Sequence, residues 1–166
     1  VQLDVIFERL PELNHIVSVS NLACLWVVLA GTKVVHELAH GLACKHYGGE
    51  CHEIGVMLLV FTPCLYCDVS DAWSIRSRRH RIAISAAGIC VEMMLASIAT
   101  FLWWFSRPGL LNTVCLDVML VCGVSTLIFN GNPLLRYDGY FILSDLVNVP
   151  NLWQRSRDTL HKSLSN

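Results

Sequence analysis

Charged residues are scarce in this chain of 166 residues, because Asp, Glu, Lys and Arg make up only 15% of it. Soluble domains usually carry about 25%, so an ordinary water-exposed surface is not expected. The formal net charge of −1 lacks the basic excess of a nucleic-acid-binding protein, and no nucleic acid partner is predicted. Hydrophobic residues account for 54%, which excludes intrinsic disorder because there is ample apolar surface to bury. A very apolar globular domain or a membrane protein remains.

The few charges are almost absent from three long stretches of the sequence. Each stretch holds a single charged residue: Lys33 in residues 16–35, Glu92 in residues 82–105 and Asp117 in residues 110–129. A helix needs about 20 apolar residues to cross a hydrocarbon core roughly 30 Å thick, and none of these stretches has the polar face of a soluble amphipathic helix. We therefore predict an all-α polytopic membrane protein in a lipid bilayer, with transmembrane helices at about residues 16–46, 82–105 and 110–130.

The segment between the first two spans is apolar but too short to cross a bilayer. It covers residues 54–66, Pro63 is expected to break it, and residues 56–61 have the composition of a strand. We predict a small β-hairpin or re-entrant segment here, whose edge could pair with an extended peptide. Residues 139–166 are predicted to form a polar interfacial tail. Because the chain begins with Val1 rather than Met, it is expected to be a single membrane-embedded core from a longer protein.

The basic residues are divided unevenly between the two sides of the predicted membrane. Three crossings place residues 47–81 and everything after about residue 130 on one side, together with most of the Lys and Arg residues. The other side holds only Arg9 and Arg107. The positive-inside rule therefore predicts that the first side is cytoplasmic.

One motif carries chemistry, and it lies near the end of the first predicted span: His36-Glu37-Leu38-Ala39-His40. Residues four apart share a helix face, so both imidazoles can hold one metal ion. Glu37 is placed to act as a general base toward water, as in metalloproteases. Three ionisable groups at the end of a transmembrane helix are costly to bury without a partner or a metal. This favours a metal centre over a set of polar residues that grip a neighbouring helix.

A catalytic zinc ion usually has three protein ligands and one open position, and three residues compete to be the third ligand. His46 follows on the same helix, but Ala43 provides no turn, so an unbroken helix should point His46 away from the motif. Glu92 lies in mid-span, and its depth disfavours it. Its expected role is an interhelical hydrogen bond, in a helix whose small residues 85–88 permit close packing. Asp138 follows the third span, which ends on the same side as the first, and is the best candidate.

These residues together resemble the site-2 protease family of intramembrane zinc metalloproteases. That family combines His-Glu-x-x-His on its first core helix with Asn-x-x-Pro-x-Pro-x-Leu-Asp-Gly on its third. This chain matches the second pattern at Asn130, Pro133, Asp138 and Gly139 and departs from it at Leu135 and Tyr137. Three further segments are similar to the bacterial peptide zinc metalloprotease branch of the family: residues 62–73, 85–92 and 132–140.

The resemblance implies a three-helix metalloprotease core with one zinc ion per chain. It implies that His36, His40 and Asp138 bind zinc, with Glu37 as the base. It also implies that Asn130 positions the substrate or stabilises the developing oxyanion. The expected function is hydrolysis of peptide bonds in a membrane-embedded protein or peptide, in the bacterial cytoplasmic membrane, with the active site near the cytoplasmic face. Members of this branch are often encoded beside secretion or peptide-modification machinery, so partners of that kind are expected.

Two other functions remain open. A non-catalytic membrane subunit could use the same zinc site to bind or escort a peptide during export, and it would not need Glu37. A metal transporter would need ligands along a path through all three spans, for which Glu92 and Asp117 are thin support. Cys64 and Cys67 could form a redox pair or half of a metal site. Simple packing is the better interpretation, because no second pair of cysteines stands at a suitable distance.

Overall fold

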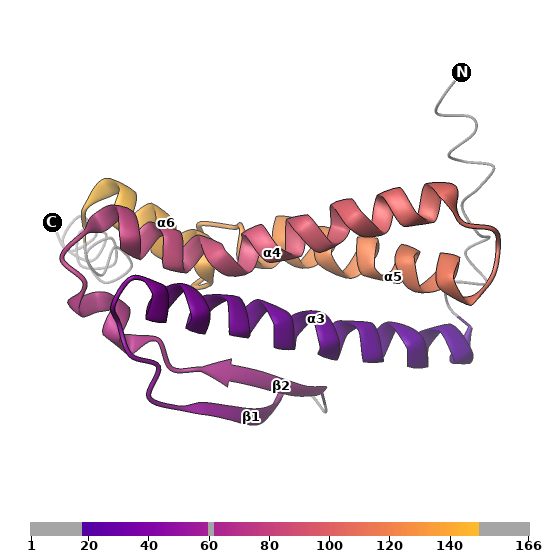
Figure 1. Ribbon diagram of the computed structural model, residues 1–166, viewed down its shortest axis with the longest axis horizontal. Helices are drawn as coiled ribbons and strands as arrows, with labels where there is room; N and C mark the ends of the chain where they lie inside the picture. Colours follow the sequence, from indigo (N-terminus) through magenta and orange to yellow (C-terminus); the bar gives the residue numbers. More distant parts are fainter. Residues whose placement is uncertain (1–17, 60–61, 150–166) are drawn as a thin grey trace, which may run out of the picture.

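Three long helices form the body of the molecule. The structure is a computed structural model of the chain and describes residues 18–59 and 62–149. The helices lie side by side (Figure 1) and are α3 (Val19–His46), α4 (Arg78–Phe105) and α5 (Leu110–Val124). A π-helical turn, η2 (Ser125–Asn130), continues α5. Three segments are long and apolar enough to cross a membrane: Asn21–His46, Arg78–Phe105 and Leu110–Asn130. The three-helix architecture predicted from the sequence is present.

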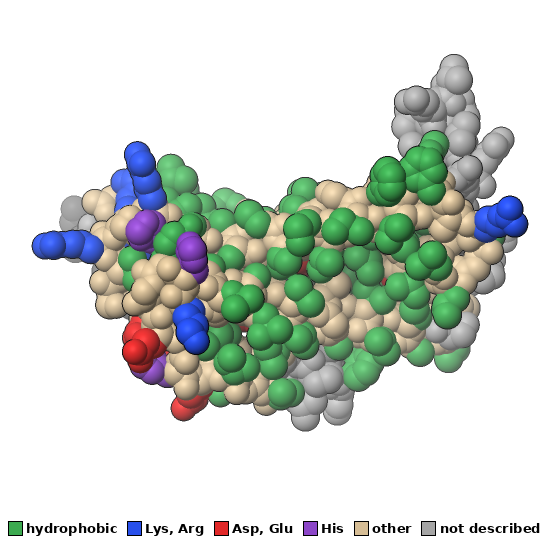
Figure 2. Space-filling model, viewed as in Figure 1, with side chains coloured by type: hydrophobic (Ala, Val, Ile, Leu, Met, Phe, Trp, Pro, Cys, Tyr) green, Lys and Arg blue, Asp and Glu red, His purple; other side chains and the backbone are tan. Residues whose placement is uncertain are grey.

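The bundle keeps its polar residues inside and its apolar residues outside. Among the described residues, buried polar and charged side chains outnumber buried hydrophobic ones. Large apolar side chains cover the middle of the molecule in Figure 2, and many are well exposed, including Val27 (63%), Phe101 (65%) and Leu127 (78%). A soluble protein shows the reverse arrangement, whereas helices in lipid satisfy their polar groups against one another. The distribution among the described residues is consistent with a membrane protein.

The single charges of the three predicted spans all point into the bundle. Lys33 Nζ of α3 lies 2.8 Å from Glu92 Oε1 of α4. Asp117 of α5 is fully buried and accepts a hydrogen bond of 3.3 Å from Asn21 Nδ2 of α3. Lys33 and Glu92 thus compensate each other's charge, whereas Asp117 has an amide donor at one oxygen, and its other oxygen has no hydrogen-bond partner among the described residues.

A hairpin joins the first two long helices, as the sequence predicts. Strands β1 (Ile54–Leu59) and β2 (Thr62–Cys67) pair antiparallel, from Ile54 opposite Cys67 to Leu59 opposite Thr62. β2 lies along α3, and β1 is the outer strand (Figure 1). Pro63 does not break the segment but pairs with Leu58 inside β2. Both strands of a two-stranded sheet are edge strands, so the missing N–H of Pro63 removes at most one ladder hydrogen bond and is tolerated there.

The last described element is α6 (Asp138–Val147), which packs on α4. Its residues fall at the start of the segment that the sequence predicts to be an interfacial tail, and they form a regular helix. Arg81 Nη2 of α4 lies 2.7 Å from Asp145 Oδ1 of α6, and both side chains are largely buried. This ion pair fixes α6 at the end of the bundle where α3 ends and α4 begins (Figure 1). The rest of the predicted tail, residues 150–166, lies outside the described part of the chain.

Candidate metal centre

Two histidines and one carboxylate converge between α3 and the start of α6. His36 and His40 lie one helical turn apart on α3, and their Nε2 atoms are 3.1 Å from each other. Asp138 places Oδ2 3.2 Å from His36 Nε2 and Oδ1 3.3 Å from His40 Nε2. Both histidines are buried, and Asp138 is largely so. The structure thus brings together the three residues predicted as metal ligands.

The spacing of these atoms fits a small divalent cation. Zinc–ligand bonds of about 2.0–2.1 Å in a tetrahedron place the ligand atoms about 3.3 Å apart. The two Nε2 atoms are 3.1 Å apart, each lies 3.2–3.3 Å from a different oxygen of Asp138, and one ligand atom from each residue lies within 4.8 Å of the others. Asp138 Oδ2 is buried and has no hydrogen-bond partner among the described residues, and such an oxygen is costly unless a cation or donor meets it. Burial by itself would raise the pKa of Asp138, but the contacts with His36 and His40 lower it to about 2. The donor set is therefore two imidazoles and an ionised carboxylate.

Close backbone contact returns Asp138 to the level of the histidines. A Cβ atom at Gly139 would lie 2.7 Å from the carbonyl oxygen of Gly131 and 3.0 Å from that of Asn130. The chain after η2 therefore loops out and comes back against its own starting point, with no room for a side chain at Gly139. The glycines of the Asn-Gly and Asp-Gly pairs allow this close approach. The closed loop thereby determines where the Asp138 carboxylate lies.

One face of α4 supports the two imidazoles. Ile84, Gly88 and Glu92 are four residues apart, all buried and all turned toward α3. The Ile84 carbonyl lies 2.8 Å from His40 Nδ1. Because a carbonyl only accepts, Nδ1 must donate, which leaves the Nε2 lone pair for a metal. A Cβ atom at Gly88 would lie 2.5 Å from Nε2 of both imidazoles, so only glycine leaves space for the rings. The small residues 85–88 predicted close packing between helices here, but not that Gly88 makes room for the histidine rings.

Glu92 lies at the same depth as His36, so the depth argument made from the sequence is wrong. Glu92 Oε1 is 3.0 Å from His36 Nδ1, on the opposite side of the ring from Asp138. The expected interhelical hydrogen bonds are present, because Glu92 also accepts from Ser125, Thr126 and Asn130.

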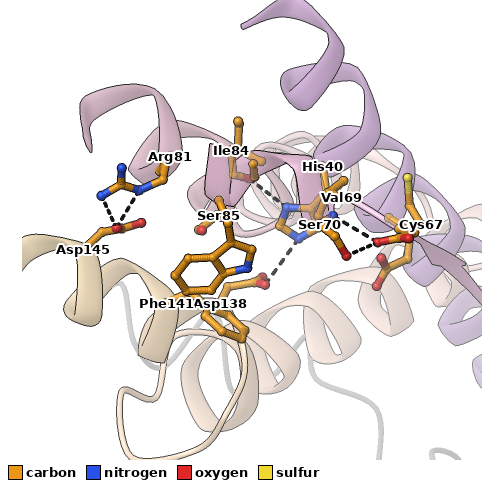
Figure 3. Close-up of a pocket in the computed structure, with 14 residues that line it drawn as sticks. His40, Cys67, Val69, Ser70, Arg81, Ile84, Ser85, Asp138, Phe141 and Asp145 are labelled. Carbon is orange, nitrogen blue, oxygen red and sulfur yellow. Dashed lines mark hydrogen bonds and ion pairs between the residues drawn. The ribbon is translucent and has the colours of Figure 1, made fainter. Parts of the chain in front are cut away.

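Glu37 faces a cavity of about 320 Å³ that also exposes His40 and Asp138. No hydrogen bond or ion pair joins the half-buried Glu37 to another described residue. Figure 3 shows His40 held between Asp138 and the Ile84 carbonyl, with the Arg81–Asp145 pair at another part of the wall. The cavity therefore places a free carboxylate next to the convergent ligands, which is the arrangement a general base requires.

The other residues singled out from the sequence lie elsewhere. Asn130 is buried, and its Nδ2 donates to Glu92 Oε2 at 3.0 Å. It does not line the cavity, so its contact with a substrate stays a prediction. His46 is exposed and packs on Tyr47 with 5.0 Å between ring centres, as expected for an unbroken helix. α3 ends at His46, and Gly48 follows the C-cap residue Tyr47 with a left-handed φ of 85°.

Two free cysteines, Cys51 and Cys67, lie close together beside the cavity. Cys67 lines the cavity, and its Sγ lies 2.7 Å from Sγ of Cys51. The side chain of Cys64 lies outside the described part of the structure. Three polar residues of the connecting loops also approach one another, with His52 Nε2 3.2 Å from Asp71 Oδ1 and Glu50 close to both. These three side chains are largely exposed, and they do not touch the convergent ligands.

Comparison with known proteins gives a weak but consistent result. No family model matches the chain, and no solved structure matches it. A curated protein of Bacillus subtilis (strain 168), named "Putative peptide zinc metalloprotease protein YydH", is 26% identical over 111 residues. The match covers 66% of this chain and 42% of the relative, so the chain spans less than half of that protein. The similarity indicates a protein like a zinc metalloprotease and carries no finer assignment.

Proposed function

We propose that this chain is the metal-binding core of a membrane-embedded zinc metalloprotease of the site-2 type, which hydrolyses peptide bonds in a membrane-associated protein or peptide. The observation that carries the proposal is the convergence of His36, His40 and Asp138, with one ligand atom of each within 4.8 Å of the others, beside the cavity that Glu37 lines. The name of the Bacillus subtilis relative agrees with this chemistry.

Each residue of the centre then has a defined task. Zinc bound by His36, His40 and Asp138 supplies Lewis-acid activation of water and of the scissile carbonyl. Glu37, free of other partners among the described residues, takes the proton from the attacking water and passes it to the leaving amine. A structural zinc site has no use for such a carboxylate, which favours an enzyme over a peptide escort.

The surroundings of the cavity suit a substrate that comes from the bilayer. The cavity is close to the end of the bundle that holds α6 and the basic start of α4, the end that the positive-inside rule assigns to the cytoplasm. Water enters from that side, while the apolar outer surface keeps a substrate segment in lipid. A helical substrate must unwind before its carbonyls can react, and the outer strand β1 offers an edge with which an unwound segment could pair.

The first experiment measures zinc bound per chain after purification in detergent. We expect one zinc ion in the wild type, almost none in Asp138→Ala, and one in His46→Ala, the matched control because His46 lies away from the centre. Zinc that is unaffected by Asp138→Ala would contradict the proposed ligand set. Wild-type protein that stays empty after incubation with zinc would remove the basis for metalloprotease chemistry.

The second experiment separates catalysis from metal binding. Zinc-loaded protein is incubated in bicelles with single-span polypeptides that carry helix-weakening residues, and products are identified by mass spectrometry. Glu37→Gln should keep its zinc and lose at least 99% of the cleavage, since general-base catalysis contributes about 10²–10⁴-fold. Equal cleavage by wild type and Glu37→Gln would rule out Glu37 as the base. Zinc without cleavage in the wild type would favour the peptide-escort function instead.

A further inference from the structure

We propose that Glu92 is a positioning residue of the metal centre: it fixes the ring of His36, and Lys33, Thr126 and Asn130 hold the Glu92 carboxylate in place. The inference rests on the proposed metal site. It assigns a function to a charged residue in the middle of α4 that belongs neither to the ligands nor to the cavity wall.

The first step is the position of Glu92 relative to the His36 ring. Asp138 approaches the ring at Nε2, whereas Glu92 Oε1 is 3.0 Å from Nδ1 on the other side. Nδ1 is buried and has no other close partner among the described residues, and its 3.0 Å contact with Glu92 is not aligned as a hydrogen bond. A metal-binding histidine usually donates its second N–H to a carboxylate or carbonyl, which fixes its tautomer and orientation. Glu92 is the acceptor available to His36.

The second step is that hydrogen-bond donors, one of them a lysine, surround Glu92. Lys33 Nζ donates to Oε1 at 2.8 Å, Thr126 Oγ1 donates to Oε2 at 2.7 Å, and Asn130 Nδ2 donates to both oxygens at 3.1 and 3.0 Å. A fully buried carboxylate among donors, with a lysine as its counter-charge, is held as an anion. His36 must then present an N–H at Nδ1, which directs the lone pair of Nε2 toward Asp138 and His40.

The third step is that α4 provides a hydrogen-bond acceptor for Nδ1 of each histidine. His40 Nδ1 is held by the Ile84 carbonyl at 2.8 Å, and His36 Nδ1 faces Glu92 two turns further along the same helix face. Gly88 lies between them and leaves room for both rings. One face of α4 therefore supplies an acceptor for each imidazole, a carbonyl for one and a carboxylate for the other.

The π-helical turn η2 completes the environment of Glu92. Five residues separate Ser125 from Asn130, and a π-helix places such residues on one face. Both are buried together with Thr126, and Asn130 Nδ2 is 3.2 Å from Ser125 Oγ. A regular α-helix would turn one of them away from Glu92. The third helix thus contributes its polar end to the positioning of His36 as well as to the return of Asp138.

The test measures metal binding rather than turnover. Zinc affinity is determined by competition with a chelator on the detergent-purified full chain, and Co²⁺ is used as a spectroscopic probe of ligand geometry. Glu92→Gln should weaken zinc binding about 10–100-fold and change the visible Co²⁺ spectrum. Thr126→Val removes one donor to Glu92 and should shift both readouts in the same direction by less.

The matched control is Asp117→Asn. Asp117 is also a fully buried carboxylate with an amide donor, Asn21, but Asn21 lies roughly 20 Å along α3 from His36 at 1.5 Å per residue. Its replacement should leave the zinc affinity and the Co²⁺ spectrum unchanged. A loss equal to that of Glu92→Gln would show a general effect of buried charge and overturn the inference.

The outcomes distinguish this inference from the proposed function. If the wild type binds no zinc, both are contradicted. If the wild type binds zinc and Glu92→Gln binds it with the same affinity and Co²⁺ spectrum, only the role of Glu92 is overturned. If Glu92→Gln is not recovered as a folded protein by size-exclusion chromatography, Thr126→Val decides, and unchanged values in that variant overturn the inference.

Discussion

Gly88 determines whether the two imidazoles can lie side by side. In Gly88→Ala the new methyl group would lie 2.5 Å from Nε2 of both His36 and His40, so the rings or α4 must move. Overpacking of this kind typically costs about 1–3 kcal/mol, and part of that cost falls directly on the metal ligands. We expect zinc affinity to fall about tenfold or more, measured by competition with a chelator.

Gly123→Ala is the control for Gly88→Ala, because Gly123 is also helical and a Cβ atom there would meet nothing within 4 Å. Alanine is the better helix former, so this variant should bind zinc as the wild type does and be slightly more stable. Zinc binding by Gly88→Ala at the wild-type level would show that the rings are not confined by α4.

Single residues differ in how far the sequence reveals them. His36, Glu37 and His40 are visible because their spacing has chemical meaning on any helix, and Asp138 follows from the side on which the third span ends. The roles of Gly88 and Glu92 cannot be predicted from spacing in the sequence in this way. Their roles depend on the register between α3 and α4, and that register is set by packing between segments about fifty residues apart in sequence.

The loop between η2 and α6 is the element that delivers Asp138. Gly139→Ala places a methyl group 2.7 Å from the Gly131 carbonyl oxygen, which should push α6 outward and take Asp138 with it. Alanine favours a helix over glycine by up to about 1 kcal/mol, so any loss reflects this contact rather than helix propensity. We expect clearly weaker zinc binding together with an intact helical circular dichroism spectrum.

Gly31→Ala provides the comparison for that variant, because Gly31 lies on α3 and a Cβ atom there meets nothing within 4 Å. It should keep wild-type zinc affinity. If Gly139→Ala also keeps it, the close return of the chain is not what positions Asp138.

Elements are predictable from the sequence as far as local pattern defines them. The apolar runs identify the three helices, but hydropathy detects only their lipid-compatible part, so it misses that α4 begins at Arg78. The β-branched and apolar residues before Pro63 indicate a strand, whereas the pairing of Pro63 itself depends on its position in an edge strand of a two-stranded sheet. α6 is missed because its anchor is the contact of Asp145 with Arg81, a partner far away in the sequence.

At the scale of the whole molecule, polar side chains lie inside the bundle and apolar ones outside, and the metal centre lies nearer to one end of the bundle than to the other. Lys and Arg side chains gather at the end of the bundle that carries α6 (Figure 2), and His40 lies closer to this end of α3 than to the other. The cavity is near the same end, so water has a short path to Glu37 while most of the bundle surface stays apolar. The proposed hydrolysis of a substrate held in lipid needs this combination, because water and substrate would then reach the centre by different routes.

The exposed apolar surface predicts that arginine destabilises the protein to different degrees at two exposed apolar positions. Ile98 is 51% exposed in the α4 span, and Leu134 is 82% exposed in the loop before α6. In water, arginine at either position should change stability by less than about 0.5 kcal/mol. In a bilayer, Ile98→Arg should cost about 2.5–3.5 kcal/mol near the centre of a span, whereas Leu134→Arg should cost little because it lies outside the spans. We therefore expect Ile98→Arg to reduce the fraction of chains that resist alkaline extraction from membranes, and Leu134→Arg to match the wild type. Equal, wild-type behaviour of both variants would argue that the exposed face of α4 does not contact lipid.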